Sequence, residues 1–400
     1  MTSSYFLVFG KVNQCSYLNY HYVKMKICIN CIQPDTRPGI YFNEEGVCGA
    51  CLWEMEKNGI DWNVRENELQ EIADEAKLKT TSNYDCVIGV SGGKDSTFQA
   101  INSREKLGLR CLLVNCEPAG ITEIGRHNIE NLKNLGFDVI TIRPNPKKLK
   151  TLMQYDFFNY LNPIKITEFA LYSSTYIIAE KFDIPLIIQG ENPGLTLGAS
   201  LSGVGTDSNA LKANELETLS KGIEEYLTID GIVTKDLFLY QYDQSILEKK
   251  GIKGIWLQYY LKEWSQHGNA EFSKKYGLLW RPDNFDPASI GTYVPYNALD
   301  TDWHQVNQML KCVKFGFGQC VDWTCYDLRE NRITKDKAID LVLKYDGKCD
   351  NKFINKFCDY FEIPNDKFWT TVEKFRGPMW TKKENGEWVN EYHNKLKEIK

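Results

Sequence analysis

The sequence predicts an α/β fold: a doubly wound parallel sheet, preceded by a small metal-binding module and followed by a mainly helical region. Four short apolar runs alternate with helix-like segments between residues 81 and 245. Apolar strands separated by helices are typical of a parallel sheet with helices on both faces. Ahead of that region stand two Cys-x-x-Cys pairs, and behind it the helical patterns continue without further apolar strands.

The bulk composition narrows the class of protein. A chain of 400 residues is long enough for two or three domains. Lys plus Arg number 48 and Asp plus Glu number 53, a net charge of −5 that argues against a nucleic-acid-binding protein. We find no apolar run long enough to span a membrane and no signal peptide, so we expect a cytoplasmic protein. Its 13 cysteines should therefore be buried, catalytic or metal-bound rather than paired in disulfides.

We divide the chain into four regions. Residues 1–24 are an aromatic and polar lead-in, and because Met25 begins the natural-looking "MKICINC", we expect 1–24 to be an extension or a mis-assigned start. Residues 25–80 hold the cysteine pairs and a linker helix. The alternating region is 81–245, and 246–400 is the C-terminal region.

The predicted elements follow from periodicity. In the linker helix, "VRENELQEIADEAK", one helical face carries Leu69, Ile72, Ala73 and Ala76. The C-terminal region has helical patterns at 334–346 and 350–361 and a long loop at 281–300 punctuated by Pro and Asn. A loop of that length is usually functional or disordered. In the alternating region the predicted strands are 84–90, 111–117, 138–144 and 185–191, and the predicted helices are 95–107, 121–136 and 166–182.

The cysteine pairs predict a structural zinc site. Cys28-x2-Cys31 and Cys48-x2-Cys51 are separated by sixteen residues that contain turn residues and a Tyr41-Phe42 strand, which is how a zinc ribbon is built. Four thiolates leave no open position for water, so we expect the zinc to fold the module rather than catalyse. A labile iron–sulfur cluster is the alternative.

The other cysteines form no Cys-x-x-Cys pair, and those in predicted strands are interpreted as small buried hydrophobes. Cys312, Cys320 and Cys325 lie close together in sequence and are a minor candidate for a second metal site.

The stretch "SGGKDS", residues 91–96, follows the first predicted strand and opens a helix. A helix N-terminus behind two glycines presents free N–H groups to an anion, so the turn indicates a phosphate site. It is not a Walker A motif, because Asp95 stands where Ser or Thr is needed, and it lacks the third glycine of the dinucleotide fingerprint. An ordinary glycine turn is the alternative.

This loop resembles the PP-loop of the ATP pyrophosphatase superfamily, whose members share the HUP-type fold and cut ATP between its α and β phosphates. The resemblance implies ATP and Mg²⁺ as cofactors, with Lys94, Asp95 and Glu191 as catalytic residues. Parallel sheets bind ligands at the carboxyl ends of their strands, where "QGENPG" also falls. The expected nucleotide-binding residues are Ser91, Gly92, Gly93, Lys94, Asp95, Ser96, Asn115, Gly190, Glu191 and Asn192. For Glu191 and Asn192 the alternative is a strand-end turn with a helix cap.

Four blocks in order carry a narrower resemblance, to the bacterial N-acetyl sugar amidotransferase family: "CINCIQPDTRPGIYFNEEGVCGAC", "YDCVIGVSGGKDS", "IPLIIQGENP" and "KFGFGQCVD". It runs from about residue 25 to at least 345. It implies that an acetamido group of a surface-sugar precursor, free or nucleotide-linked, becomes acetamidino through an O-adenylyl intermediate, with release of AMP and pyrophosphate. After the "FG" block, "QCVDWTCYD" departs from the family's pattern, so the resemblance assigns no sugar contacts.

We recognise no glutaminase in the sequence: no Cys follows Met25, and no G-x-C-x-G elbow occurs with a paired His-x-Glu. We therefore expect a partner glutaminase as the ammonia donor, with a barrel-shaped channel subunit as a further candidate, docked on residues 246–400.

Two other functions remain open. One is a PP-loop enzyme that thiolates tRNA, which would need a basic channel and a reactive Cys cluster. The other is a zinc-ribbon scaffold with an inactive nucleotide fold, which the intact loop disfavours.

Overall fold

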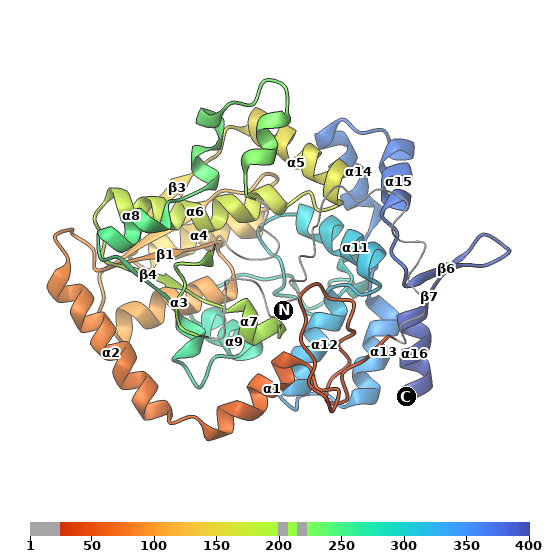
Figure 1. The fold of residues 1–400 in the computed structure, drawn as a ribbon, viewed down its shortest axis with the longest axis horizontal. Helices are drawn as coiled ribbons and strands as arrows, with labels where there is room; N and C mark the ends of the chain where they lie inside the picture. Colours follow the sequence, from red (N-terminus) through yellow and green to blue (C-terminus); the bar gives the residue numbers. More distant parts are fainter. Residues whose placement is uncertain (1–24, 199–206, 214–221) are drawn as a thin grey trace, which may run out of the picture.

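A computed structural model describes residues 25–198, 207–213 and 222–400. The expectations for residues 1–24 lie outside this part of the chain. Its centre is a five-stranded, all-parallel sheet in the order β3-β2-β1-β4-β5 (Figure 1). The strands are β1 (Cys86–Gly89), β2 (Cys111–Cys116), β3 (Asp138–Ile142), β4 (Leu186–Gln189) and β5 (Lys253–Trp256).

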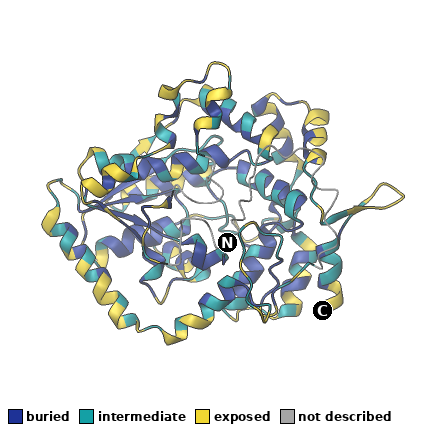
Figure 2. Cartoon of the chain, viewed as in Figure 1, coloured by how far each residue is buried: buried dark blue, intermediate teal, exposed yellow. Residues whose placement is uncertain are grey.

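Both faces of the sheet are apolar and covered by helices, which is why its strands read as continuous hydrophobic runs. Val87, Leu112 and Ile187 point to the face covered by α5 and α6. Cys86, Ile88 and their neighbours point to the face covered by α2, α3, α4 and α9. Figure 2 shows the resulting layer of buried residues along the sheet. The helices are α2 (Trp62–Lys79), α3 (Lys94–Glu105), α4 (Glu123–Asn134), α5 (Pro146–Tyr160), α6 (Lys165–Lys181), α7 (Pro193–Leu197), α8 (Gln244–Lys249) and α9 (Gln266–Lys275).

The α/β fold class predicted from the sequence is confirmed, with differences in detail. Each of the four predicted strands is present, shortened by one to three residues, and the three predicted helices become α3, α4 and α6. The sheet layer also holds elements that were not predicted, namely α5, α7, α8, α9 and β5. The buried apolar residues of α5, Leu149, Leu152, Met153 and Phe157, do recur at helical spacing. Strand β5 is a four-residue strand that pairs with β4 and comes from residues assigned to the C-terminal region.

The N-terminal module contains the four paired cysteines and α1 (Gly49–Glu56). The expected Tyr41-Phe42 strand is wrong: in the described residues Phe42 forms only an isolated bridge with Cys48. The module packs against the C-terminal helices rather than the sheet (Figure 1), in a cluster shared with Phe317, Val321 and Ile339. A hydroxyl from near the C-terminus, that of Tyr392, also donates a hydrogen bond to the Ile32 carbonyl.

The C-terminal region is mainly helical, as predicted, and the long loop at 281–300 contains one short helix. A small hairpin follows α15 and precedes the last helix. The elements are α10 (Pro287–Ile290), α11 (Trp303–Phe315), α12 (Gln319–Arg329), α13 (Lys335–Tyr345), α14 (Asn351–Phe361), α15 (Asn365–Lys374), β6 (Trp380–Lys382), β7 (Trp388–Asn390) and α16 (Glu391–Ile399).

None of the helices described here combines the length and the apolar character that crossing a bilayer requires.

Trp303 joins the C-terminal helices to the sheet layer. Its side chain is 1% exposed and contacts the rings of Phe357 and Phe361, while its indole lies against Gly120, where a Cβ atom would come within 2.6 Å of the ring. We expect Trp303→Ala to lower the free energy of unfolding by about 3–5 kcal/mol, because it empties a well-packed site. Denaturant unfolding measures this. Trp369→Ala, at a 42% exposed tryptophan, should cost far less, and equal losses would contradict the packing described.

Candidate active site and metal centre

The phosphate-type loop lies at the carboxyl end of β1, between that strand and α3. Gly92 adopts a left-handed conformation with φ +78°, and a Cβ atom there would lie 3.1 Å from the Asn128 Cβ. Glycine is therefore required both by the turn and by its packing on α4. Gly93 is the N-cap of α3, and no side chain caps this helix. The first N–H groups of α3 thus lack a side-chain acceptor and can bind an anion.

A cavity of about 260 Å³ lies beside this loop. Because β1 and β4 are neighbours in the sheet, the turn after β4 reaches the same cavity. Five of the predicted site residues line it: Ser91, Gly93, Lys94, Asp95 and Glu191.

The two charged residues of the loop form an ion pair. The Lys94 ammonium lies against the Asp95 carboxylate, and the other Asp95 oxygen accepts a hydrogen bond of 2.8 Å from the Asn269 amide. Ser273, one turn further along α9, donates a 2.7 Å bond to the Lys94 carbonyl. Helix α9 therefore fixes the first turn of α3, including Lys94 and Asp95, two of the three residues that the resemblance implies for catalysis.

Glu191 is partly buried on the β4 side of the cavity. Burial raises the pKa of its carboxyl group, and the negative charge of Asp95 raises the pKa further, while Lys94 opposes the shift. The Gln266 amide donates a 3.2 Å hydrogen bond to Glu191. A carboxylate that is partly buried near a second carboxylate marks a site where a cation is favoured.

The remaining predicted residues are not among those that line the cavity. Ser96 donates a 3.1 Å hydrogen bond to the Gly93 carbonyl, and the buried Asn115 donates one of 2.9 Å to Val90. At Gly190, a Cβ atom would come within 2.1 Å of the Gln99 amide, so this glycine is required by packing. Asn192 caps α7 through a 2.8 Å bond from Gly194 N–H, as the helix-cap alternative expected. These residues support the turns whose other members line the cavity.

The opposite wall comes from the C-terminal region. On α12, the side chains at positions i, i+3, i+4 and i+7 face the cavity, and they fall within the "QCVDWTCYD" segment that departs from the family's pattern. The 281–300 loop and α11 supply the rest. The lining residues from this wall and from α9 are Gln266, Tyr296, Asn297, Ala298, Leu299, Asp300, Gln308, Gln319, Asp322, Trp323 and Tyr326.

Sequence reasoning missed these side chains as individual site residues, although it marked the 281–300 loop as a functional candidate. The loop is held on both sides. The partly buried Arg281 guanidinium donates hydrogen bonds to three carbonyls between 295 and 298. From the sheet layer, Thr122 at the start of α4 donates to the Leu299 carbonyl and accepts the Gly125 N–H. The wall is therefore fixed relative to the phosphate-type loop.

Asp322 connects the cavity to the cysteine module. Its carboxylate pairs with Arg37, which lies between the two cysteine pairs, and with Lys311 of α11. Burial alone would raise the pKa of Asp322, but the Arg37 and Lys311 cations outweigh it and hold the pKa below its usual range. Both cations also lie over the ring of the buried Phe317. The carboxylate is consequently ionised and fixed in position.

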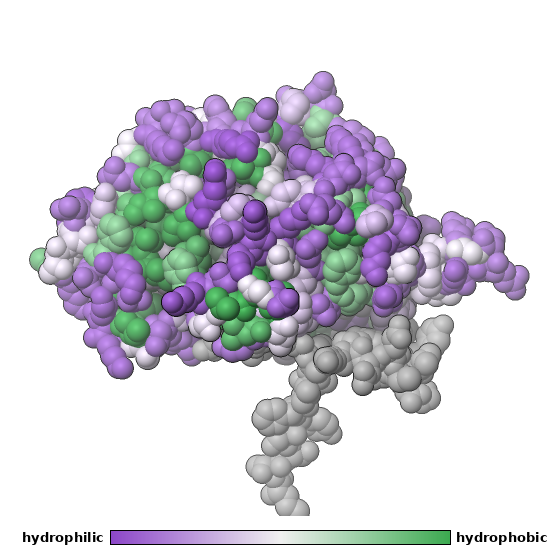
Figure 3. All heavy atoms as spheres, turned by 90° about the horizontal axis from the view of Figure 1, so that it is seen from above, coloured by the Kyte–Doolittle hydropathy of each residue, from purple (hydrophilic) through white to green (hydrophobic). Residues whose placement is uncertain are grey.

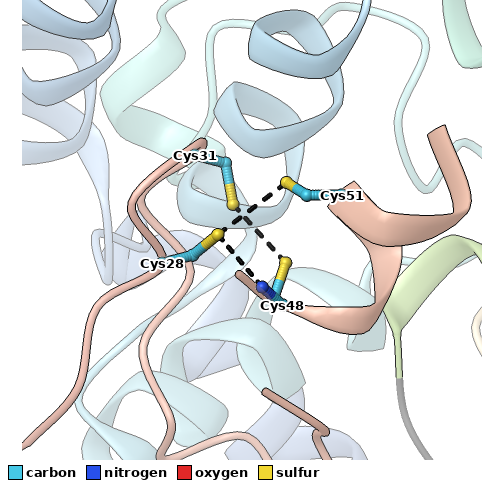
Figure 4. Close-up of side chains that lie close together, drawn as sticks. All are labelled: Cys28, Cys31, Cys48 and Cys51. Atoms are coloured by element: carbon cyan, nitrogen blue, oxygen red, sulfur yellow. Dashed lines mark hydrogen bonds between the residues drawn. The ribbon is translucent and has the colours of Figure 1, made fainter. Parts of the chain in front are cut away.

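The four cysteines predicted as metal ligands come together in the structure (Figure 4). All are buried, and their sulfur atoms lie within 4.8 Å of one another. The Cys28–Cys51 and Cys31–Cys48 sulfur pairs are each 3.8 Å apart. With Zn–S bonds of about 2.3 Å, a tetrahedral site has S···S edges of about 3.8 Å, so the donor set fits a Zn²⁺ ion.

The surroundings also fit four thiolates. The N–H groups of Gln33 and Cys48 donate to the sulfurs of Cys31 and Cys28. Arg329 lies near the cluster: burial lowers its pKa, but the charges of Cys31, Cys325 and Cys51 outweigh this and raise it. The guanidinium would balance part of the net charge of −2 that four thiolates leave on a dication. A second site is not formed, because this is the one group of three or more potential ligands found in the described chain.

Comparison with known proteins bears on the C-terminal wall. Residues 284–397 match a family model. That model describes the C-terminal domain of WbpG-like LPS biosynthesis proteins. This WbpG-like segment contains the Asn297–Asp300 loop, α11 and α12, and so supplies most of the wall.

No curated protein matches the chain. Solved structures that match include an NH3-dependent NAD synthetase from Campylobacter jejuni in complex with nitrate, at 15% identity over 57% of this chain and 100% of that one, with a TM-score of 0.28. An NMN synthetase from Francisella tularensis matches at 16% identity over 56% of this chain and 100% of that one, with a TM-score of 0.28.

The cysteine cluster generates a prediction about metal content. We expect one Zn²⁺ per chain in the purified protein, and the Cys28→Ser, Cys48→Ser double variant should lose it, because two of the four ligands are removed. Elemental analysis measures both. Cys349→Ser, outside the cluster, should keep the metal. Full zinc content in the double variant would contradict the assignment, and iron with sulfide in the wild type would mean an iron–sulfur cluster.

Proposed function

We propose that the protein is an ATP-dependent N-acetyl sugar amidotransferase, which adenylates the oxygen of an acetamido group and lets ammonia displace AMP. The observation that carries the proposal is the shared cavity: an uncapped helix N-terminus with Lys94 forms one wall, and the WbpG-like segment forms the wall opposite. One wall suits phosphates, and the other suits a sugar acceptor. The sequence resemblance to sugar amidotransferases supports the same reaction.

The chemistry needs an activated amide, because the amide oxygen is a poor leaving group. The acetamido oxygen attacks the α-phosphorus of ATP, and the bond from that phosphorus to the bridging oxygen breaks, releasing pyrophosphate. Ammonia then adds to the imidate carbon and AMP leaves with the former amide oxygen. In sum, amide, ATP and ammonia give amidinium, AMP and singly protonated pyrophosphate.

Residues of the loop would act on the phosphates. The Lys94 ammonium and the N–H groups at the start of α3 would stabilise charge that develops on the α-phosphate and on the leaving pyrophosphate. Asp95 and Glu191 are the carboxylates that would hold Mg²⁺, which supplies further charge neutralisation when bound. The ion pair with Lys94 and the Asn269 bond keep Asp95 oriented before the nucleotide arrives.

The cavity composition weighs against the tRNA-thiolation alternative. Sulfur transfer of that kind needs a reactive cysteine at the reacting centre, and none of the described residues that line the cavity is a cysteine. The paired cysteines are buried in the module and oriented toward one another.

The ammonia would come from a partner glutaminase. An adenylyl imidate that is exposed to water hydrolyses and wastes ATP, so a docked subunit that makes ammonia in place and excludes water is favoured. A barrel-shaped channel subunit would complete such an assembly.

Figure 3 shows a mainly polar face on which apolar side chains gather in patches, so the surface is not uniformly hydrophilic. In the C-terminal region, exposed apolar residues include Leu279 and Trp369.

The loop generates a prediction about ATP. We expect Ser91→Ala and Asp95→Asn to leave the melting temperature almost unchanged. Each variant should reduce acceptor-dependent formation of AMP by about 100-fold or more, because it removes a group that stabilises the phosphoryl-transfer transition state. Product analysis of ATP, Mg²⁺, ammonium and acetamido sugars measures it. Ser103→Ala is the matched control, since Ser103 lies on α3, as Asp95 does, but is buried and outside the cavity lining. Release of ADP and phosphate instead of AMP would contradict the proposal.

The nitrogen source generates a second prediction. The isolated chain should use ammonium at high concentration but not glutamine, because the sequence shows no recognisable glutaminase. Addition of a separate glutaminase subunit, with its channel subunit where one exists, should restore glutamine use. Coupled measurement of glutamate and AMP tests this, and unaided turnover of glutamine by the isolated chain would contradict it.

A further inference from the structure

His267 lies in the first turn of α9, beside the candidate site. The residue before it, Gln266, donates a 3.2 Å hydrogen bond to the Glu191 carboxylate. Two residues after it, Asn269 donates one of 2.8 Å to the Asp95 carboxylate. The same turn that holds both carboxylates of the site therefore also places a titratable imidazole next to them.

A hydrogen bond joins this imidazole to the cavity wall. Nδ1 of His267 lies 3.2 Å from the hydroxyl oxygen of Tyr296, a partly exposed residue that lines the cavity. The Tyr296 ring packs edge-on against Trp323, with ring centres 5.4 Å apart, and the Lys94 nitrogen lies 5.4 Å from the centre of the Trp323 ring. Tyr296 thus lies between the imidazole and the part of the wall that meets the phosphate-type loop.

The other side of the imidazole leads to solvent. Nε2 of His267 lies 4.0 Å from Oε1 of Glu271, and the two side chains are 32% and 50% exposed. An imidazolium formed here would have a carboxylate partner and access to water. Tyr296, His267 and Glu271 therefore mark a path from the cavity to the surface.

The surroundings keep the imidazole neutral before the reaction. Burial lowers the pKa of His267, and the Arg332 cation lowers it further, while the Glu271 and Asp327 carboxylates oppose the shift. Burial also raises the pKa of the Tyr296 hydroxyl, which stays protonated. A neutral imidazole beside a protonated phenol can accept its proton. The charged groups around the pair are Glu271, Asp327, Glu330 and Arg332.

The proposed reaction has to remove a proton from the incoming nitrogen. Ammonia that adds to the imidate carbon becomes positively charged, and while it is charged it leaves more readily than AMP does. It must lose one proton before AMP departs and the amidinium forms. Nitrogen that enters as ammonium must lose a further proton before it can add.

We propose that Tyr296 and His267 carry this proton away. The Tyr296 hydroxyl takes it from the nitrogen, directly or through one water, while passing its own proton to Nδ1 of His267, and the imidazolium releases a proton to solvent from Nε2. The pyrophosphate released earlier binds one proton from solvent, so the sum of the reaction is unchanged. This inference rests on the proposed function.

The test separates the nitrogen step from adenylation. Sugar-dependent exchange of pyrophosphate into ATP measures adenylation, and AMP formed at limiting ammonium gives kcat/KM for ammonium. We expect Tyr296→Phe and His267→Ala to keep the exchange rate and to lower kcat/KM for ammonium by about 100-fold, as loss of a general base does. His127→Ala, at an exposed histidine on α4, is the matched control and should behave as the wild type.

Three readouts distinguish proton transfer from a structural role. Hydroxylamine is a weaker base than ammonia and gives up its proton to water readily, so both variants should use it at close to the wild-type rate. Imidazole in solution should restore ammonium use to His267→Ala, because the side chain that it replaces is partly exposed. The third readout is the pH profile. Below the ordinary histidine pKa of about 6.5, wild-type kcat/KM should fall more steeply than protonation of ammonia explains, because the imidazole becomes charged, and His267→Ala should lack this extra fall.

The outcomes also separate this inference from the proposed function. Wild-type kcat/KM for ammonium in both variants, or equal losses with hydroxylamine and ammonium, would overturn the proton path and leave the amidotransferase proposal standing. Loss of pyrophosphate exchange in the variants would also overturn the path, because the residues would then act before nitrogen enters. Absence of exchange and of AMP in the wild type, with a panel of N-acetylhexosamines, free and UDP-linked, would overturn both proposals.

Discussion

The position of the candidate site depends on one constraint, the parallel pairing of β1 with β4. In a parallel sheet, all strands end at the same edge, and the strand order decides which strand-end turns become neighbours. Here the chain leaves β1 toward β2 and β3 on one side and returns to β4 on the other. The turn carrying Lys94 and Asp95 and the turn carrying Glu191 therefore meet, although almost one hundred residues separate them. The charge interactions within the cavity follow from this adjacency.

The second wall depends on contacts that bring the termini of the described chain together. The cysteine module packs on α12 and α13, and its Arg37 reaches the Asp322 carboxylate at the edge of the cavity. On its other side, the module touches the C-terminal end of α7: the Gly49 backbone lies so close to Gly198, the C-cap of α7, that a Cβ atom at Gly49 would be 2.9 Å from the Gly198 carbonyl oxygen. A module that is remote in sequence thus contacts both the C-terminal wall and the end of α7, the helix that follows the Glu191 turn. A metal that folds this module would order the cavity as well.

Part of this arrangement could be predicted from the sequence, for physical reasons. Strands that are buried on both faces must be continuously apolar. A glycine-rich turn before a helix indicates an anion site, because it exposes backbone N–H groups. Four thiolates in two Cys-x-x-Cys pairs favour the binding of a single metal ion. The linker helix, α3, α4 and α6 followed from periodicity in the same way. Residues such as Gln308 and Trp323 could not be identified as site residues. The pattern of an amphipathic helix shows which of its faces is covered, but not whether protein or a bound ligand covers that face. Strand β5 is too short to leave a period, and its place comes from pairing with β4.

The charges around the cavity indicate how nucleotide binding would proceed. Among the described residues that line it, Lys94 is the single cation, against the carboxylates of Asp95, Glu191, Asp300 and Asp322. Lys94 is already paired with Asp95, and Asp322 with Arg37 and Lys311, which leaves Glu191 and Asp300 to repel a triphosphate. Burial raises the pKa of Glu191, and the charge of Asp95 raises it further, in keeping with this crowding of negative charge. A nucleotide alone would therefore be disfavoured, whereas a nucleotide that arrives with divalent cations would convert the carboxylates from repelling groups into ligands. On this electrostatic argument, the acidic side chains would make the proposed ATP binding conditional on the metal ion.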